Sequence, residues 1–166
     1  MTPFGRFFLP GPTEVRDDIL AAQHRAMIGH RGKGLEALIA RIAPSLQRLF
    51  CTTRPVYISA SSATGFMEGA LRNGARRRVL SLVNGAFSDR FHKIALACGL
   101  EADALNVEWG DFHDPQQVAD AVRAGGYDAV TVVHSETSTG VLNPIRELAA
   151  AVHAVGDVVL LVDSVT

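Results

Sequence analysis

The chain has 166 residues, of which 48% are hydrophobic and 20% are charged, and its formal net charge is −1. This composition supplies enough apolar surface for one packed domain and excludes a disordered chain. The absence of a basic excess leaves no electrostatic footprint for nucleic acid or for an anionic membrane surface.

Signals for targeting and for metal binding are absent as well. Residues 1–10 contain no basic segment followed by a long apolar run, and no apolar run approaches the roughly 18 residues that span a bilayer. We therefore expect a cytoplasmic protein. Cys51 and Cys98 have no CxxC spacing and no histidine at metal-ligand spacing, so we expect buried free thiols and no metal site.

The first part of the chain predicts helices. A turn-rich, extended segment at 9–12 precedes a helix over roughly 16–27, which the glycines of 29–32 interrupt. Apolar residues then recur at helical spacing over 35–49. Pro44 lies within that run and predicts a kink or a division of the helix.

The rest of the chain alternates short apolar strands with helices of 10–15 residues. The predicted strands are 55–59, 79–83, 102–107, 129–133 and 158–162, and the predicted helices are 64–73, 87–98, 115–124 and 144–155. Asp114 and Pro115 stand where a helix cap and the first helical residue belong. This alternation indicates an α/β fold with a mostly parallel sheet covered on both faces. Ligands of such sheets bind at the carboxyl ends of the strands.

Two of these strand ends lead into helices. Small and hydroxyl residues at 61–65 open a helix, where free N–H groups favour an anion such as a phosphate. An ordinary helix cap explains the same residues, and the GxxxxGK[ST] and GxGxxG fingerprints are both absent. Phe87 follows the next strand and can either stack on a planar ring or belong to the core. Arg90, one helical turn later, is expected at the surface.

Two further strand ends carry polar groups. The segment 134–140 places an imidazole, a carboxylate and four hydroxyls after a buried strand, so it lies at the surface or forms a site. Asp163 closes the last strand and needs a cationic or N–H partner to remain ionised there. A protonated pyridine nitrogen, a Mg²⁺ ion or an arginine would each serve.

These segments occur together in a recognisable order. They are LPGPT at 9–13, GHR at 29–31, SATGFME at 62–68, NGAF at 84–87, HSETSTG at 134–140 and LVDS at 161–164. The series resembles the class V aminotransferases, in particular the alanine–glyoxylate, serine–pyruvate and serine–glyoxylate branch. That resemblance implies the fold-type-I architecture of pyridoxal 5'-phosphate (PLP) enzymes. Residues 1–30 would form an N-terminal extended segment and helix, and residues 31–166 the first part of the large PLP-binding domain.

The resemblance also implies an activity and a cofactor site. An amino group would move between a small amino acid, alanine or serine, and a 2-oxo acid such as glyoxylate or pyruvate, in a protein that forms a homodimer. The implied cofactor contacts are Ser62, Ala63 and Thr64 at the phosphate, Phe87 stacked on the pyridine ring, Ser138 near the ring oxygen and Asp163 at the pyridine N–H⁺. Gly29 and His30 would lie near the substrate entrance. Ser61 and Ala63 replace glycines that are usual in relatives, but both are small.

The lysine that forms the Schiff base in this family lies a few tens of residues beyond the VDS segment, whereas this chain ends at Thr166. Lys33 and Lys93 are the only lysines, and both stand in other segments. We therefore expect a transaminating full-length parent, and a 166-residue chain that lacks the catalytic residue and is inactive. A cysteine desulfurase or lyase of the same fold, a nucleotide- or flavin-binding module, and a non-catalytic remnant are the alternatives. Desulfurases usually carry histidine in place of Phe87.

Overall fold

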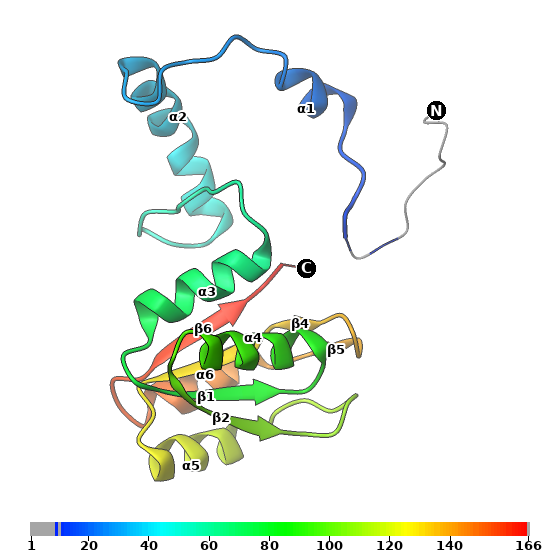
Figure 1. The fold of residues 1–166 in the computed structure, drawn as a ribbon, viewed down its shortest axis with the longest axis vertical. Coiled ribbons are helices and arrows are strands. Elements are labelled where there is room, and N and C mark those ends of the chain that lie inside the picture. Colours follow the sequence, from blue (N-terminus) through cyan, green and yellow to red (C-terminus); the bar gives the residue numbers. More distant parts are fainter. Residues whose placement is uncertain (1–8, 10, 166) are drawn as a thin grey trace. The chain divides into compact units, whose positions relative to one another are not determined.

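The computed structural model describes residue 9 and residues 11–165, which form two compact units divided between Ala60 and Ser61. Residues 1–8 and Pro10, which include part of the predicted extended segment, lie outside the described residues. The first unit is helical, and the second contains a parallel sheet (Figure 1).

The first unit holds helices α1 (Asp17–Ala22) and α2 (Lys33–Leu49). Helix α1 ends earlier than predicted, and none of its residues is buried, which agrees with the marginal stability of a short helix without tertiary packing. Helix α2 runs through Pro44 without a break, so the predicted division is wrong. A proline removes only one backbone donor, which a 17-residue helix can lose and still continue.

The predicted strand at 55–59 is also wrong. Tyr57 and Ile58 are 83% and 64% exposed, and no described strand pairs with this segment. A strand is stable only when a neighbouring strand satisfies its backbone groups, so β propensity alone does not produce one.

The second unit alternates strands and helices as the sequence predicts. Its main elements are α3 (Ala63–Gly74), β1 (Arg78–Val83), α4 (Ala86–Ala97), β2 (Glu101–Asn106), α5 (Pro115–Gly125), β3 (Ala129–Val133), α6 (Ile145–His153) and β6 (Val159–Asp163). A short antiparallel hairpin of β4 (Ser135–Glu136) and β5 (Val141–Leu142) lies between β3 and α6 and was not predicted. The predicted cap of α5 is confirmed, because the Asp114 carboxylate accepts a 2.9 Å hydrogen bond from the Gln117 N–H.

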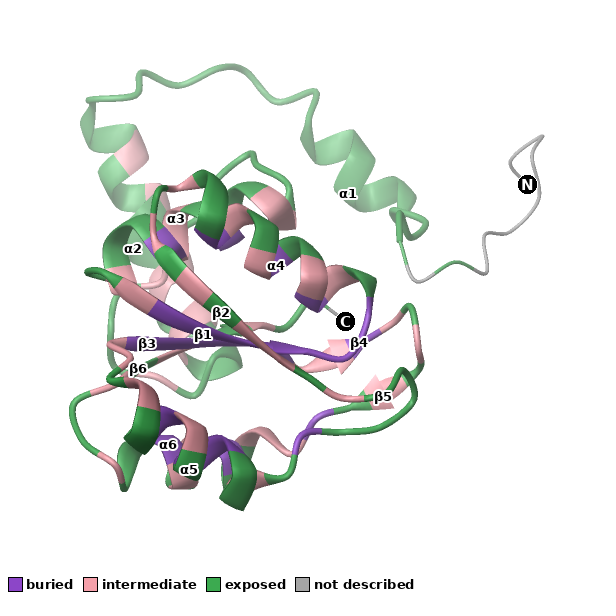
Figure 2. Ribbon diagram, turned by 60° about the horizontal axis from the view of Figure 1, so that its bottom comes forward, coloured by how far each residue is buried: buried purple, intermediate pink, exposed green. Residues whose placement is uncertain are grey.

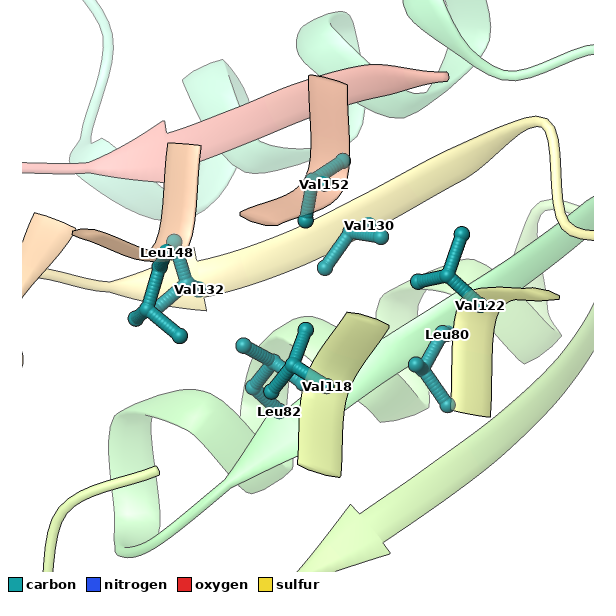
Figure 3. Close-up of a cluster of buried hydrophobic side chains, with 8 residues drawn as sticks. All are labelled: Leu80, Leu82, Val118, Val122, Val130, Val132, Leu148 and Val152. Atoms are coloured by element: carbon teal, nitrogen blue, oxygen red, sulfur yellow. The ribbon is translucent and has the colours of Figure 1, made fainter. Parts of the chain in front are cut away.

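The four long strands form a parallel sheet in the order β2-β1-β3-β6, which confirms the predicted α/β class. Helices α3 and α4 cover one face, and α5 and α6 cover the other (Figure 2). The apolar residues of β1 and β3 point alternately into these two layers. On the α5/α6 side they form a continuous cluster with the two helices (Figure 3), made of Leu80, Leu82, Val118, Val122, Val130, Val132, Leu148 and Val152.

Among the described residues, no helix combines the length and apolarity needed to cross a bilayer. Both cysteines are free thiols. Cys98 is half-buried, but Cys51 is exposed, contrary to the expectation that both are buried. Cys51 directly follows the C-terminal cap of α2, in a unit where no described helix has a buried residue.

Candidate functional site

Polar residues converge where the parallel strands end. Strands β1, β3 and β6 are neighbours, and the register pairs Val133 at the end of β3 with Asp163 at the end of β6. The chain leaves β1 through α4 on one face of the sheet and leaves β3 through α6 on the other face (Figure 2). The carboxyl end between β1 and β3 is therefore a topological switch point, the usual ligand position in such sheets.

Glu136 is the centre of the hydrogen-bond network at this edge. Its side chain is fully buried, and its carboxylate accepts five hydrogen bonds. They come from the Phe87 N–H (3.3 Å), the N–H and hydroxyl of Ser88 (2.8 and 2.9 Å), and the N–H and hydroxyl of Ser138 (3.3 and 2.6 Å). Burial raises the pKa of Glu136, but these donors outweigh it and the pKa lies below its usual value. The carboxylate is therefore ionised.

Gly85 allows Glu136 to approach the start of α4. It is the N-cap residue of that helix and has no side chain to cap it, so the Glu136 carboxylate satisfies the first N–H groups instead. A Cβ atom on Gly85 would lie 2.4 Å from Glu136 Cγ and 2.6 Å from Ser138 Oγ. The Ser138 hydroxyl also accepts a 2.9 Å hydrogen bond from the Ala86 N–H. The hairpin and the start of α4 are thus joined at close range.

Phe87 and Arg90 connect α4 with the start of α3. Phe87 is half-buried and packs against the α3/α4 core cluster, and the Arg90 guanidinium lies over its ring, 5.1 Å from the centroid. Arg90 Nη1 also donates a 3.4 Å hydrogen bond to Thr64 Oγ1. Phe87 is therefore partly a core residue, as the simpler of the two interpretations held. Arg90 is exposed as predicted, and its contacts link Thr64 to Phe87.

The start of α3 has a conventional cap. Ser62 Oγ accepts a 3.3 Å hydrogen bond from the Gly65 N–H. The next two residues, Ala63 and Thr64, have N–H groups that point out of the first helical turn and have no acceptor among the described residues. Ser62 therefore caps the helix, and the end of the helix still offers two free donors.

Asp163 differs from Glu136 in its surroundings. Its side chain is half-buried, and within residues 11–165 no hydrogen bond or ion pair reaches its carboxylate. Burial and the negative charge of Glu136 both raise its pKa above the usual value. The neighbouring His134 donates its backbone N–H to the Asp163 carbonyl oxygen at 2.8 Å, and His134 Nδ1 lies 3.2 Å from Ser164 Oγ. Asp163 is thus a carboxylate that a cationic group would stabilise.

The structure brings Thr64 and Phe87 together through Arg90, and Phe87 and Ser138 together through Glu136. The negative charge of Glu136 also acts on Asp163. Gly29 and His30 belong to the other unit, where they lie in an exposed loop before α2, and their role at a substrate entrance stays a prediction. Sequence reasoning did not select Glu136, Ser88 or Gly85. The sequence shows an acidic residue three positions after a buried strand and a glycine at the start of a helix, but no spacing in the chain connects the two.

A second buried network fixes the loop beyond β1. Asn84 and Asn143 are both buried, and each amide donates to the other at 3.3 and 3.4 Å. Asn143 also donates to the Val133 carbonyl at 2.8 Å and accepts from the His113 N–H. The His113 ring is buried with no partner among the described residues for either nitrogen, and burial lowers its pKa to about 4.

Neither lysine belongs to this edge of the sheet by its contacts. Lys93 Nζ pairs with Asp89 on the exposed side of α4, and Lys33 is the exposed first residue of α2 in the other unit.

Comparison with known proteins gives a consistent assignment. Residues 67–166 match the family model of the class-V aminotransferases. An uncharacterised aminotransferase of Methanocaldococcus jannaschii is 38% identical over 161 residues, which are 95% of this chain and 42% of that protein. The serine–glyoxylate aminotransferase of Methylorubrum extorquens is 32% identical over 166 residues, 96% of this chain and 41% of its own. The chain thus spans about two fifths of the length of these relatives.

A solved structure shows the same arrangement. The alanine–glyoxylate aminotransferase from a Nostoc species superposes with a TM-score of 0.85 at 26% identity, covering 92% of this chain and 41% of that one. The similarity therefore includes the fold as well as the local motifs.

Proposed function

The chain belongs to the class-V aminotransferase family, with the α/β architecture of fold-type-I PLP enzymes, and from this premise we propose that the carboxyl edge of its sheet binds PLP. The observation that carries the proposal is the Asp163 carboxylate, which is half-buried at the edge of the sheet without a cationic partner among the described residues. The protonated pyridine nitrogen of PLP is a cation with one N–H donor, which matches this need.

The residues around Asp163 fit the remaining parts of the cofactor. The free N–H groups of Ala63 and Thr64 at the start of α3, with the hydroxyls of Ser62 and Thr64, suit a phosphate. Because Arg90 covers one face of Phe87, the cofactor ring would stack on the remaining exposed surface of that side chain.

Ser138 has a restricted role toward the cofactor. Its single proton goes to the ionised Glu136, and one lone pair takes the Ala86 N–H, so one acceptor position remains. Ser138 would therefore accept a hydrogen bond from the ring hydroxyl rather than donate one. When bound, PLP supplies an electron-accepting ring for the negative charge that develops on the substrate Cα. The Asp163 carboxylate would hold the proton on the ring nitrogen.

For the whole protein we propose amino transfer between a small amino acid, alanine or serine, and a 2-oxo acid such as glyoxylate or pyruvate. The support is the similarity to a serine–glyoxylate and an alanine–glyoxylate aminotransferase. A homodimer, as the resemblance implies, belongs to the same proposal.

We propose that neither Lys33 nor Lys93 is the lysine that forms the Schiff base. Lys93 forms an ion pair with Asp89 on an exposed helix face, and Lys33 is the exposed first residue of α2 in the other unit. Residues 1–166 alone should therefore show no transamination with alanine and glyoxylate. Measurable turnover that disappears in Lys93→Ala would contradict this assignment.

The cofactor proposal is tested with Asp163→Asn in the whole protein. Asparagine keeps the size of the side chain but removes the charge that holds the pyridine proton, so we expect activity to fall by roughly 100-fold or more and the Kd for PLP to rise about 10-fold. Asp157→Asn is the matched control, because Asp157 is exposed just before β6. PLP binding is followed by absorbance titration and transfer by 2-oxo acid formation. Equal activity and Kd in Asp163→Asn and wild type would refute the assignment.

A further inference from the structure

Glu136 connects two segments that the proposed cofactor site requires in fixed relation. It lies in the hairpin after β3, and its partners Phe87 and Ser88 belong to the first turn of α4, 49 and 48 residues earlier in the chain. Its third partner, Ser138, is two residues away in its own hairpin. One carboxylate thus contacts both the segment with the ring-stacking side chain and the segment with the proposed ring-oxygen contact.

We propose that Glu136 is the positioning residue of the PLP site: its buried carboxylate locks the first turn of α4 to the Ser138 hydroxyl and so sets the position of Phe87 before the cofactor binds. This inference rests on the proposed function. Glu136 acts through Phe87 and Ser138 and is not itself a cofactor contact.

The energetic basis is the cost of a buried charge. A carboxylate removed from water is tolerated only when hydrogen bonds replace its hydration, and all five donors here come from three residues. Any movement of α4 relative to the hairpin would lengthen several of these bonds together. The connection is therefore stiffer than one made by neutral groups.

Close packing at Gly85 also holds the hairpin against the start of α4. The backbone at Gly85 lies so close to Glu136 that a Cβ atom would be 2.5 Å from the carboxyl carbon Cδ. The backbone φ of Gly85 is 173°, an extended value open to any residue, so the conformation does not require glycine. Glycine is required here because the Glu136 carboxylate leaves no room for a side chain.

Glu136 also contributes charge to the site. Its field raises the pKa of Asp163, so the two carboxylates jointly favour a positively charged group at the edge of the sheet. Glu136 has its full set of donors, whereas Asp163 has no donor among residues 11–165, and this difference assigns the ligand contact to Asp163.

The test replaces Glu136 with glutamine in the whole protein. The glutamine Nε2 group would face donors instead of accepting from them, so one side of the network, the Ser88 or the Ser138 side, loses its acceptor. In the cofactor-free protein we expect amide hydrogen exchange at Phe87 and Ser88 to become about 10-fold faster. Glu147→Gln is the matched control, because Glu147 lies exposed in the first turn of α6 and no described residue bonds to it; its exchange should match wild type.

A cofactor readout separates positioning from general stability. In the folded fraction of Glu136→Gln we expect the Kd for PLP to rise about 10-fold and the induced circular dichroism per bound cofactor to change, because the ring would meet a displaced Phe87. A purely structural role would leave both values unchanged in molecules that remain folded. Wild-type exchange at Ser88, together with wild-type Kd and dichroism, would overturn the positioning role.

A second variant keeps the test decisive if Glu136→Gln does not fold. Ser88→Ala retains the Glu136 charge and removes the hydroxyl that donates to Glu136 at 2.9 Å and accepts from the Asn84 N–H at 3.0 Å. Exchange at Phe87 and the PLP Kd should therefore shift in the same direction by a smaller factor, because the Ser88 N–H still bonds to the carboxylate. No shift in Ser88→Ala would count against the proposal. Failure of the wild-type protein to bind PLP would instead overturn the proposed function, while the exchange data would still report on the link between α4 and the hairpin.

Discussion

Replacing Gly85 with alanine would place a methyl group inside the Glu136 network. The added Cβ atom would lie 2.4 Å from Glu136 Cγ, 2.5 Å from Cδ and 2.6 Å from Ser138 Oγ, whereas ordinary contact begins at 3.4 Å. Glu136 must therefore retreat by about 1 Å, which takes its 2.8 and 2.9 Å bonds to Ser88 out of hydrogen-bonding range. Overpacking costs roughly 1–3 kcal/mol, and a lost hydrogen bond to a charged group costs about 1.5–3 kcal/mol.

We therefore expect Gly85→Ala to lower the free energy of unfolding by about 3 kcal/mol or more, measured by urea denaturation. Gly69→Ala is the matched control. Gly69 lies inside α3 with nothing within 4 Å of its added Cβ, so the same substitution should stabilise the protein by about 0.5–1 kcal/mol. A Gly85→Ala variant within roughly 0.5 kcal/mol of wild type would refute the steric reasoning and the tight packing of Glu136.

Three further predictions concern single charged or titratable groups. Burial lowers the pKa of His113 from 6.5 to about 4. The free energy of unfolding should therefore be at its full value above pH 6.5 and fall by about 3 kcal/mol as the pH drops to 4. In urea titrations at several pH values, His113→Leu should remove this pH dependence. Burial raises the pKa of Asp128, but hydrogen bonds from the N–H groups of residues 76–78 lower it below its usual value. Asp128→Ala should therefore lower the free energy of unfolding at pH 7 by about 3 kcal/mol, measured by urea denaturation. This loss should shrink as the pH falls below 4. The pKa of Asp163 is raised in the folded protein, so its negative charge lowers stability once the pH rises above the pKa of Asp163 in the unfolded chain. Asp163→Asn should therefore raise the Tm of the cofactor-free protein at pH 7 while weakening PLP binding. A lower Tm in differential scanning fluorimetry would contradict this prediction.

Local patterns in the sequence predicted most elements of the second unit within one or two residues. The apolar strand at 129–133 is bounded as predicted, and Asp114 caps α5, because both features depend on residues that are neighbours in the chain. The strand predicted at 55–59 shows the limit of this reasoning. Its β-branched and aromatic residues favour extended backbone, but a strand requires a hydrogen-bonded partner, and periodicity does not supply one.

The sequence by itself determined the alternation of strands and helices, the family motifs, and the positions of Ser62, Phe87, Ser138 and Asp163 directly after strands or at helix starts. Only the tertiary structure decided how these positions are connected. The order β2-β1-β3-β6 places β3 beside β1, and this neighbourhood brings Glu136 to amide groups 48 residues earlier in the chain. The physical reason is that a buried carboxylate finds its donors across space, so no spacing in the chain distinguishes Glu136 from a surface acid until the sheet has formed.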